Sequence, residues 1–476
     1  MITAGSGADL SFFYIITDVV YGCLRQIPDK AHVERNTWAQ SRERTKQRTR
    51  RCPEEPVLYR IIYCFREDFE RLWPDLFEHK YGALRQVVLE AFDDYLNCGI
   101  LFHGAARAVC SDCGHSELIA FSCKRRNVCP SCDAKRGVIF AENLHENVLP
   151  KLPIRHLVFS TPKRIRPYFQ FNRELSQILY RGAWEAWKEY VESALPGSRT
   201  GMVSSLHYAG DLMHFHPHAH AIVLDGAKDS TGEFHQLSAV DTAQLERSFQ
   251  LLVLDALQER GVLEPDVVWN MLSWEHSGFH VYAGDVVGED DADRRRFLGR
   301  YLKKSAVSLA RLELDETGIE PVLRLVKHCD DGDETRELSP LEFLAELSTQ
   351  VPDVSEQSSR FYGLFSARTR GAERERKRIA EMLSHVRADG GEELPTLMPQ
   401  SERPESKRKA SASWAACMKR VFLIDPLECP KCGGQMVIKA FVHDAREIQR
   451  LCKNLGLEAW RAPPPLARVR MLQEAA

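Results

Sequence analysis

The spacing of apolar positions along the chain predicts helices and strands in separate runs. Apolar side chains recur at three- and four-residue steps through residues 56–103, which predicts a helical N-terminal region. Residues 154–161 and 202–225 are patterned as strands, and residues 173–193 between them are patterned as a helix. A basic helix is expected at about 291–311, after an acidic start that suits the helix dipole. The expected fold class is therefore α+β.

These patterns divide the 476-residue chain into seven expected segments. The first four are an N-terminal segment (1–55), a helical region (56–103), a cysteine-rich module (104–146) and a domain built on the strands (147–312). The last three are an accessory region (313–384), a polar linker (385–412) and a small C-terminal domain (413–476). The N-terminal segment holds seven basic side chains between Arg35 and Arg51, against Glu43 alone. Such a run is typical either of a solvated helix or of an arm that follows phosphates.

The composition is that of a globular protein with more than one domain. Hydrophobic residues make up 44% of the chain and charged residues 28%, which leaves ample apolar material for a core. The net charge of −3 does not exclude a nucleic-acid partner, because DNA binding needs local basic faces rather than a basic total. No apolar run approaches the roughly 18 residues of a membrane span. Because Asp18 also interrupts the apolar patch near the N-terminus, we expect a cytoplasmic protein without a signal peptide or membrane partner.

Six of the fourteen cysteines form three Cys-x-x-Cys pairs, and such pairs in a reducing compartment indicate metal binding. Cys110/Cys113 and Cys129/Cys132 are separated by fifteen residues, which is the spacing of a four-thiolate zinc site. Zinc would supply folding energy that so short a segment lacks. We therefore expect these four cysteines to bind one structural Zn²⁺, with Cys123 as a candidate substitute ligand.

The third pair, Cys429 and Cys432, supplies only half of a zinc site. Cys417, His443 or Cys452 would complete it. The alternative is a turn that binds no metal.

Basic side chains surround the first two cysteine pairs. Lys124, Arg125 and Arg126 lie between the pairs, and Lys135 and Arg136 follow them. A rigid zinc knuckle with this charge is suited to contact with a DNA backbone, whereas the alternative is that some of these charges are simply solvated.

The most informative segment is a run of alternating histidines at 214–220, followed by Ala-Ile-Val-Leu-Asp-Gly. Alternate residues of a strand share a face, so His218 and His220 project together while Ala219 points toward the core. Pro217 cannot donate to a sheet ladder, so the strand is expected to begin near it or to lie at an edge there. Two imidazoles on one strand face can hold a metal ion and leave positions open for substrate oxygens.

Three kinds of metal enzyme could use such a strand. A metallo-β-lactamase type of site needs an Asp-His pair soon after the second histidine, but Ala221, Ile222 and Val223 follow it here. An amidohydrolase needs a long series of β/α repeats downstream, which the pattern does not contain. The third kind is a nuclease with a His-hydrophobic-His strand, in which a metal polarises a scissile phosphate and a tyrosine on a later helix attacks it.

Tyr301 lies on the expected basic helix and is the candidate nucleophile. The pKa of a phenol in water is about 10, so attack requires a base or nearby positive charge. Arg300, Lys303 and Lys304 can supply that charge and can also hold phosphates. Attack by a tyrosine forms a 5′-phosphotyrosyl link and leaves a free 3′-hydroxyl. Tyr282 is the reserve candidate, and packing is the alternative role for a tyrosine on a helix.

Several motifs agree in order and spacing with those of one known family. They include the Gly-Arg-Tyr triplet and the histidine strand ending in Leu-Asp-Gly, and they lie at 98–101, 121–132, 152–160, 214–226, 299–301, 361–368 and 421–434. From about residue 56 to residue 460, the chain resembles the rolling-circle transposases of bacterial insertion sequences and the related common-region elements.

The resemblance implies a nuclease domain of the HUH type (His-hydrophobic-His) on an antiparallel sheet. It implies that His218 and His220 hold a catalytic Mg²⁺ or Mn²⁺, and that Tyr301 cuts single-stranded DNA at the element ends and passes it to target DNA. The family often has glutamine where His207 stands, so His207 is the expected third ligand. Some relatives carry a second tyrosine where Ser305 stands here, so a single-tyrosine mechanism is expected.

Two other functions remain candidates. A plasmid replication initiator or relaxase would use the same chemistry, although a zinc knuckle ahead of the nuclease argues against it. A zinc-dependent DNA-binding regulator without catalysis is the candidate from another class. The family's Arg-Pro-Pro after the tyrosine appears here as Lys304-Ser-Ala, a departure that bears on activity.

Overall fold

The computed structural model describes residues 53–318, 320–327, 329, 332–388, 427–461 and 463. The basic run from Arg35 to Arg51, with its two alternative interpretations, lies outside these residues, as do Cys417 and nearly all of the expected linker. The described part combines helices with antiparallel sheets, which confirms the α+β prediction. None of its helices is both long and apolar enough to cross a membrane.

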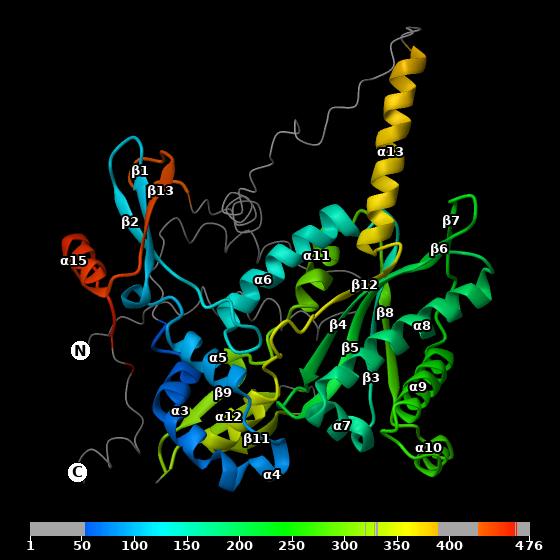
Figure 1. Cartoon of the computed structure of the whole chain (residues 1–476), viewed down its shortest axis with the longest axis horizontal. Helices are drawn as coiled ribbons and strands as arrows, with labels where there is room; N and C mark the ends of the chain where they lie inside the picture. The colour runs from blue at the N-terminus through cyan, green and yellow to red at the C-terminus, as the bar shows by residue number, and fades with distance from the viewer. Residues whose placement is uncertain are drawn as a thin grey trace.

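A five-stranded sheet, here called the central sheet, forms the scaffold of the larger domain (Figure 1). Its strand order is β12-β4-β5-β3-β8, and all neighbours are antiparallel. The strands span, in chain order, Ile154–Ser160 (β3), Gly201–Ala209 (β4), Phe215–Leu224 (β5), His280–Val287 (β8) and Arg360–Gly363 (β12). Strand β12 comes from the expected accessory region, so that region completes the edge of the central sheet.

The histidine strand β5 lies in the middle of this sheet and includes Pro217. The pairing of β5 with β4 is irregular between His207 and Ala209, and its pairing with β3 begins at His218. Pro217 therefore occupies a point where neither ladder requires its missing N–H. The strand begins two residues earlier than the proline, close to the expected place.

Helices cover one face of the central sheet with a large apolar core (Figure 1). Small side chains of β5, Ala219 and Ala221 among them, point to this face and share its core with Trp187 and Phe249. The Asp241 carboxylate caps the helix that carries Phe249. The elements on this side are Lys163–Ile165 (η3), Arg166–Phe171 (α7), Arg173–Leu175 (η4), Ser176–Ala194 (α8), Thr242–Glu259 (α9) and Pro265–Leu272 (α10), and the hairpin of Gly226–Lys228 (β6) and Phe234–Gln236 (β7) extends from this domain.

Two helices cover part of the opposite face, α6 (Pro130–Asn143) and α11 (Ala292–Tyr301), together with the π-turn Leu144–Val148 (η2). They cross closely at Gly299, where an added Cβ would lie 2.8 Å from the Cα of Ala141. Helix α11 is shorter than the expected 291–311. The Lys304 N–H bonds back three residues to Tyr301, which tightens and ends the helix there.

The predicted helical N-terminal region is confirmed. Phe69, Trp73 and Phe92 from this region share a core with Phe343 of the expected accessory region. The elements of this part are Val57–Leu76 (α3), Glu78–Tyr81 (α4), Gln86–Leu96 (α5), Leu309–Arg311 (η5), Leu312–Asp315 (β9), Val322–Lys327 (β10), Glu334–Leu338 (β11) and Pro340–Ser348 (α12). The three strands form a small antiparallel sheet of order β11-β10-β9.

A second three-stranded sheet lies apart from the central sheet, with strand order β13-β1-β2 (Figure 1). It joins the cysteine-rich module to residues expected to form a separate C-terminal domain, because β13 pairs with β1 along its length. The elements here are Leu101–His103 (η1), Ala105–Cys110 (β1), Ser116–Ala120 (β2), Met436–Val442 (β13) and Ala445–Leu455 (α15). The remaining long helix, Ala367–Ala388 (α13), projects away from the body of the molecule (Figure 1).

Candidate catalytic and metal-binding sites

Three histidines gather on the face of the central sheet that lies beside α11. The alternation of β5 directs His218 and His220 to this face, and His207 on β4 stands opposite His218 in the register. One ring nitrogen from each histidine lies within 4.8 Å of the others. The structure therefore brings together the two predicted ligands and the expected third one.

Backbone carbonyls fix the tautomers of two of these rings. The Nδ1 atom of His218 lies 2.6 Å from the carbonyl oxygen of His216, and the Nε2 atom of His207 lies 3.3 Å from that of Leu302. A carbonyl oxygen only accepts, so each of these nitrogens carries the ring proton. The other nitrogen of each ring keeps its lone pair, as a metal ligand must.

His156 is a member of this group that the sequence did not single out. It lies on β3, diagonal to His220 across the β3–β5 ladder, and its Nε2 atom is 3.1 Å from Nδ1 of His220. The two rings are nearly parallel, with an interplanar angle of 7°. The strand alternation of residues 154–161 could have assigned His156 to a face, but only the register between strands places it against His220.

The predicted nucleophile lies directly beside the histidines. Tyr301 ends α11, and its ring centroid is 5.0 Å from that of His220, 5.6 Å from that of His156 and 6.3 Å from that of His207. Burial raises the pKa of Tyr301 to about 12. The Lys304 ammonium lies 5.5 Å from the Tyr301 ring centroid, and burial lowers the pKa of Lys304 to about 8.

Burial keeps the histidines neutral near pH 7. It lowers the pKa of His218 and of His156 to about 4, and it holds the pKa values of His207 and His220 well below the ordinary histidine range. Neutral imidazoles with free lone pairs fit a divalent cation, whereas protonated ones would repel it.

The reserve tyrosine, Tyr282, lies on β8 and is paired with Val158 of β3. Val158 is paired on its other side with His220 of β5. Tyr282 therefore shares the face of the histidines, but its side chain is 50% exposed, and Tyr301 is the tyrosine in ring contact with them.

Most of the predicted DNA-binding cations have partners within the protein. The Lys303 ammonium donates to the hydroxyls of Ser358 and Ser359, at 2.8 and 2.6 Å. Arg125 pairs with the Asp94 carboxylate at 2.5 Å, Arg126 donates to a backbone carbonyl at 2.6 Å, and Arg300 is largely buried. Lys124 is the exposed member of the set. The local charge of this region thus serves its packing to a large extent.

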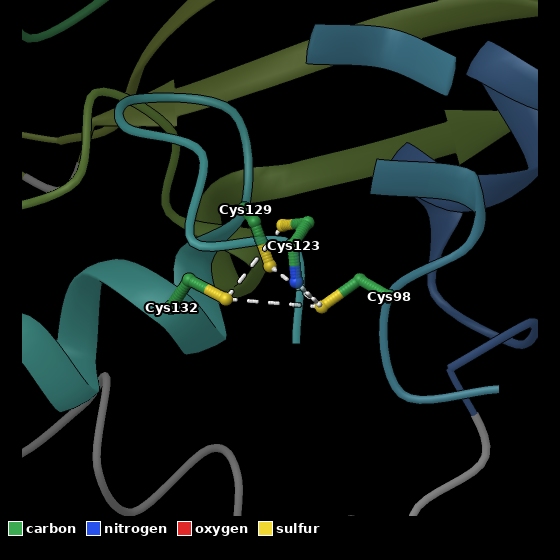
Figure 2. Close-up of side chains that lie close together, drawn as sticks. All are labelled: Cys98, Cys123, Cys129 and Cys132. Carbon is green, nitrogen blue, oxygen red and sulfur yellow. Dashed lines mark hydrogen bonds between the residues drawn. The ribbon is translucent and has the colours of Figure 1, made fainter. Parts of the chain in front are cut away.

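Four cysteines form a compact group at the entry to α6 (Figure 2). The Sγ atom of Cys98 lies 3.7 Å from those of Cys129 and Cys132, and Cys123 Sγ lies 3.6 Å from that of Cys132. A tetrahedral ion with Zn–S bonds of about 2.3 Å separates its sulfurs by about 3.8 Å, whereas a disulfide would bring them to about 2 Å. The spacing fits a zinc ion bound by four thiolates.

The predicted ligand set Cys110, Cys113, Cys129 and Cys132 is therefore wrong as a single site. Cys129 and Cys132 share their group with Cys98 and Cys123, and Cys110 and Cys113 belong to a different group with Cys429 and Cys432. The reason is topological, because β1 and β2 carry the first knuckle away from α6. Cys123 is a full member of its group rather than a substitute.

The residues expected to complete the third pair lie elsewhere. His443 packs against the ring of Phe121, with centroids 5.0 Å apart, and Cys452 is buried in an apolar cluster with Ile448 and Leu101. Neither belongs to the four-cysteine group around Cys429.

The site thus combines an antiparallel sheet that carries His-Ala-His on its central strand with a tyrosine from a following helix beside it. Comparisons with known proteins find similarity to transposases. The family described as "Transposase zinc-binding domain" matches residues 68–161, and the family described as "Putative transposase" matches residues 201–373.

Two relatives extend the comparison. Over 385 residues the chain is 26% identical to the transposase for insertion sequence element IS801 of Pseudomonas savastanoi pv. phaseolicola. This alignment covers 78% of the chain and 87% of the relative. Over 125 residues the chain is 27% identical to the "Putative transposase y4qJ" of Sinorhizobium fredii (strain NBRC 101917 / NGR234). This second alignment covers 26% of the chain and 31% of the relative. No solved structure matches the chain.

The two matched segments and the similar relative support a rolling-circle transposase of a bacterial insertion sequence, with a zinc-binding domain ahead of its transposase domain. A transposase cleaves and moves DNA, so the partner of this protein is DNA at the element ends.

Proposed function

We propose that Tyr301 cuts single-stranded DNA at the element ends by direct attack on a phosphate. The contact of its ring with His220 carries this proposal, because it places a phenol beside three convergent imidazoles. The phenol gives up its proton and its oxygen bonds to phosphorus, while the bond from phosphorus to the 3′ oxygen breaks. That oxygen takes up a proton and leaves as a 3′-hydroxyl, so no net proton is gained or lost. The 5′-phosphotyrosine keeps the bond energy that later strand transfer to a target requires.

His207, His218 and His220 would hold the catalytic cation, Mg²⁺ or Mn²⁺. The donor set fits such an ion because all three rings are neutral and their ring nitrogens converge. The bound cation would polarise the scissile phosphate and favour the ionised form of the phenol. The raised pKa of Tyr301 agrees with this requirement, since the phenol alone stays protonated near pH 7.

His156 acts as a positioning residue in this proposal. If Nε2 of His220 binds the metal ion, the ring proton of His220 is on Nδ1. This Nδ1–H group then donates a hydrogen bond to Nε2 of His156. The lowered pKa of His156 keeps this nitrogen an acceptor near pH 7. His156 therefore orients the His220 ring and leaves its lone pair directed away from β3.

The zinc group of Cys98, Cys123, Cys129 and Cys132 would fix the start of α6, against which α11 packs through Gly299. Structural zinc in this module thus supports the helix that carries Tyr301. Phosphate contacts are proposed for the exposed Lys124 and for Lys304, while Arg125, Arg126, Arg300 and Lys303 act mainly through the framework. A single tyrosine performs the cut, because Ser305 stands at the second position.

The test is formation of a covalent protein–DNA adduct. Purified protein is incubated with Mn²⁺ and a 3′-labelled single-stranded oligonucleotide that carries an element end, and the products are separated under denaturing conditions. Wild-type protein and the matched control Tyr282→Phe are expected to give the adduct, and Tyr301→Phe or a chelator is expected to abolish it. DNA binding without an adduct from the wild-type protein would favour a regulator and refute the proposal.

A further inference from the structure

We propose that Cys110, Cys113, Cys429 and Cys432 form a second four-thiolate zinc site, here called the zinc clasp. The clasp would fasten residues 427–461 to the N-terminal zinc module. Cys429 and Cys432 lie outside both family matches, which end at residues 161 and 373. The inference does not depend on the proposed nuclease chemistry, because it concerns a different part of the molecule.

The sulfur positions fit one tetrahedral ion. The Sγ atoms of Cys110 and Cys432 lie 3.5 Å apart and those of Cys113 and Cys429 lie 3.7 Å apart, and all four fall within 4.8 Å of one another. These distances are close to the roughly 3.8 Å that separates thiolates on one zinc ion. They are far longer than the roughly 2 Å of a disulfide.

The two Cys-x-x-Cys turns share one backbone design, although more than 300 residues separate them in the sequence. The first cysteine of each donates its N–H to the carbonyl five residues on, from Cys110 to His115 at 2.8 Å and from Cys429 to Gly434 at 2.7 Å. Its own carbonyl accepts from a glycine with positive φ, Gly114 or Gly433. Each turn thus presents two thiolates to the same side, as zinc knuckles do.

The knuckles also interlock with each other. The Ser111 N–H donates to the Gln435 carbonyl at 3.1 Å, and β1 and β13 pair from Cys110 opposite Met436 onward. An added Cβ on Gly434 would meet the Asp112 side chain, so glycine lets the two knuckles approach without displacing that side chain. The sequence thus favours contact between two knuckles from opposite ends of the chain.

The apolar core beneath the clasp is small. Ala108, Cys110, Cys429 and Met436 make up its buried cluster, and on the same sheet Phe441 is 69% exposed. The other apolar cluster of this sheet, around Leu101 and Ile448, packs at the Ala105 end of β1. The end that carries the four cysteines therefore buries little apolar surface of its own, and bound zinc supplies a further source of stability there. A pair of empty knuckles would leave four thiols together without that gain.

The two zinc groups differ in access to solvent. Cys113 and Cys432 are exposed, whereas Cys98, Cys129 and Cys132 are buried. A chelator should therefore remove zinc from the clasp before it removes zinc from the buried group.

The first test is the metal content of the full chain after purification with Zn²⁺. Zinc is counted in a His218→Ala/His220→Ala background, so that an ion at the histidine group does not add to the total. In that background the otherwise wild-type chain and the control Cys329→Ser should hold two zinc ions per chain, and the double variant Cys429→Ser/Cys432→Ser should hold one. In Co²⁺-substituted protein, the thiolate charge-transfer absorption should fall by about half in the double variant. One zinc ion in the otherwise wild-type chain, or two in the double variant, would overturn the proposal.

The second test measures the fastening itself. A specific protease site is inserted between residues 391 and 426 of the full chain, and the cut protein is analysed by gel filtration. The C-terminal fragment should co-elute with the remainder when zinc is bound and should separate after chelation or in the double variant. Co-elution that is indifferent to metal and to both cysteines would contradict the clasp.

Discussion

The contact between His156 and His220 gives the sharpest test of how the metal site is built. His156→Leu keeps a side chain of similar bulk on β3 but removes the acceptor 3.1 Å from Nδ1 of His220. A buried N–H without an acceptor costs about 1–3 kcal/mol. Since about 1.4 kcal/mol corresponds to a tenfold change in affinity, we expect Mn²⁺ binding to weaken by about 10–100-fold, which is the usual effect of losing such a partner.

The assay is calorimetric titration of zinc-loaded full-length protein with Mn²⁺. His280→Leu serves as the control, because His280 lies on the same sheet but its side chain is 70% exposed. His156→Gln, whose amide oxygen can accept, should recover part of the affinity. An unchanged Mn²⁺ affinity in His156→Leu, with zinc content and folding intact, would refute the positioning role.

Two further predictions concern stability. Gly299→Ala would place a Cβ 2.8 Å from the Cα of Ala141, so we expect it to reduce the free energy of unfolding by about 1–3 kcal/mol. The variant should also reduce adduct formation, because it shifts Tyr301, whereas Gly288→Ala has open space around it and should change neither property. Equal urea midpoints for the two variants would argue against the close helix crossing. Burial lowers the pKa of His216 to about 3 in the folded chain, whereas the pKa of histidine in the unfolded chain is about 6.5. Between these two pH values the unfolded chain binds a proton at His216 and the folded chain does not. Stability should therefore fall as the pH falls from about 6.5 toward 3, with His216 contributing up to about 1.4 kcal/mol per pH unit. Urea unfolding of wild-type protein and His216→Leu at pH 7 and pH 5 checks the slope, and identical slopes would contradict the burial argument.

Local periodicity predicted where several of these side chains lie. The alternation of His218 and His220 followed from the two-residue period of a strand, and the basic pattern placed Tyr301 on the right helix. The helix nevertheless ends at Tyr301 itself, because the Lys304 N–H donates to the Tyr301 carbonyl three residues back and tightens the last turn. The pattern of basic and apolar side chains does not predict this end. The result places the phenol at a helix terminus beside the histidines.

Metal ligand sets were harder to predict, because they depend on which loops meet in space. Spacing identified each Cys-x-x-Cys pair, but not which two pairs share an ion. Cys98 belongs to no such pair and joins Cys129 only through the fold of the helical region, and Cys110 meets Cys432 only through the β1–β13 ladder. His156 escaped notice for the same reason, since strand register sets its contact.

The most direct measurement of the central claim is the identity of the residue that DNA modifies. Adduct formed with Mn²⁺ and a single-stranded element end would be digested with nuclease and trypsin, and the nucleotide-bearing peptide sequenced by mass spectrometry. The geometry predicts the nucleotide on Tyr301, the phenol whose ring lies 5.0 Å from that of His220. Modification of Tyr282 or of any other residue would contradict the account.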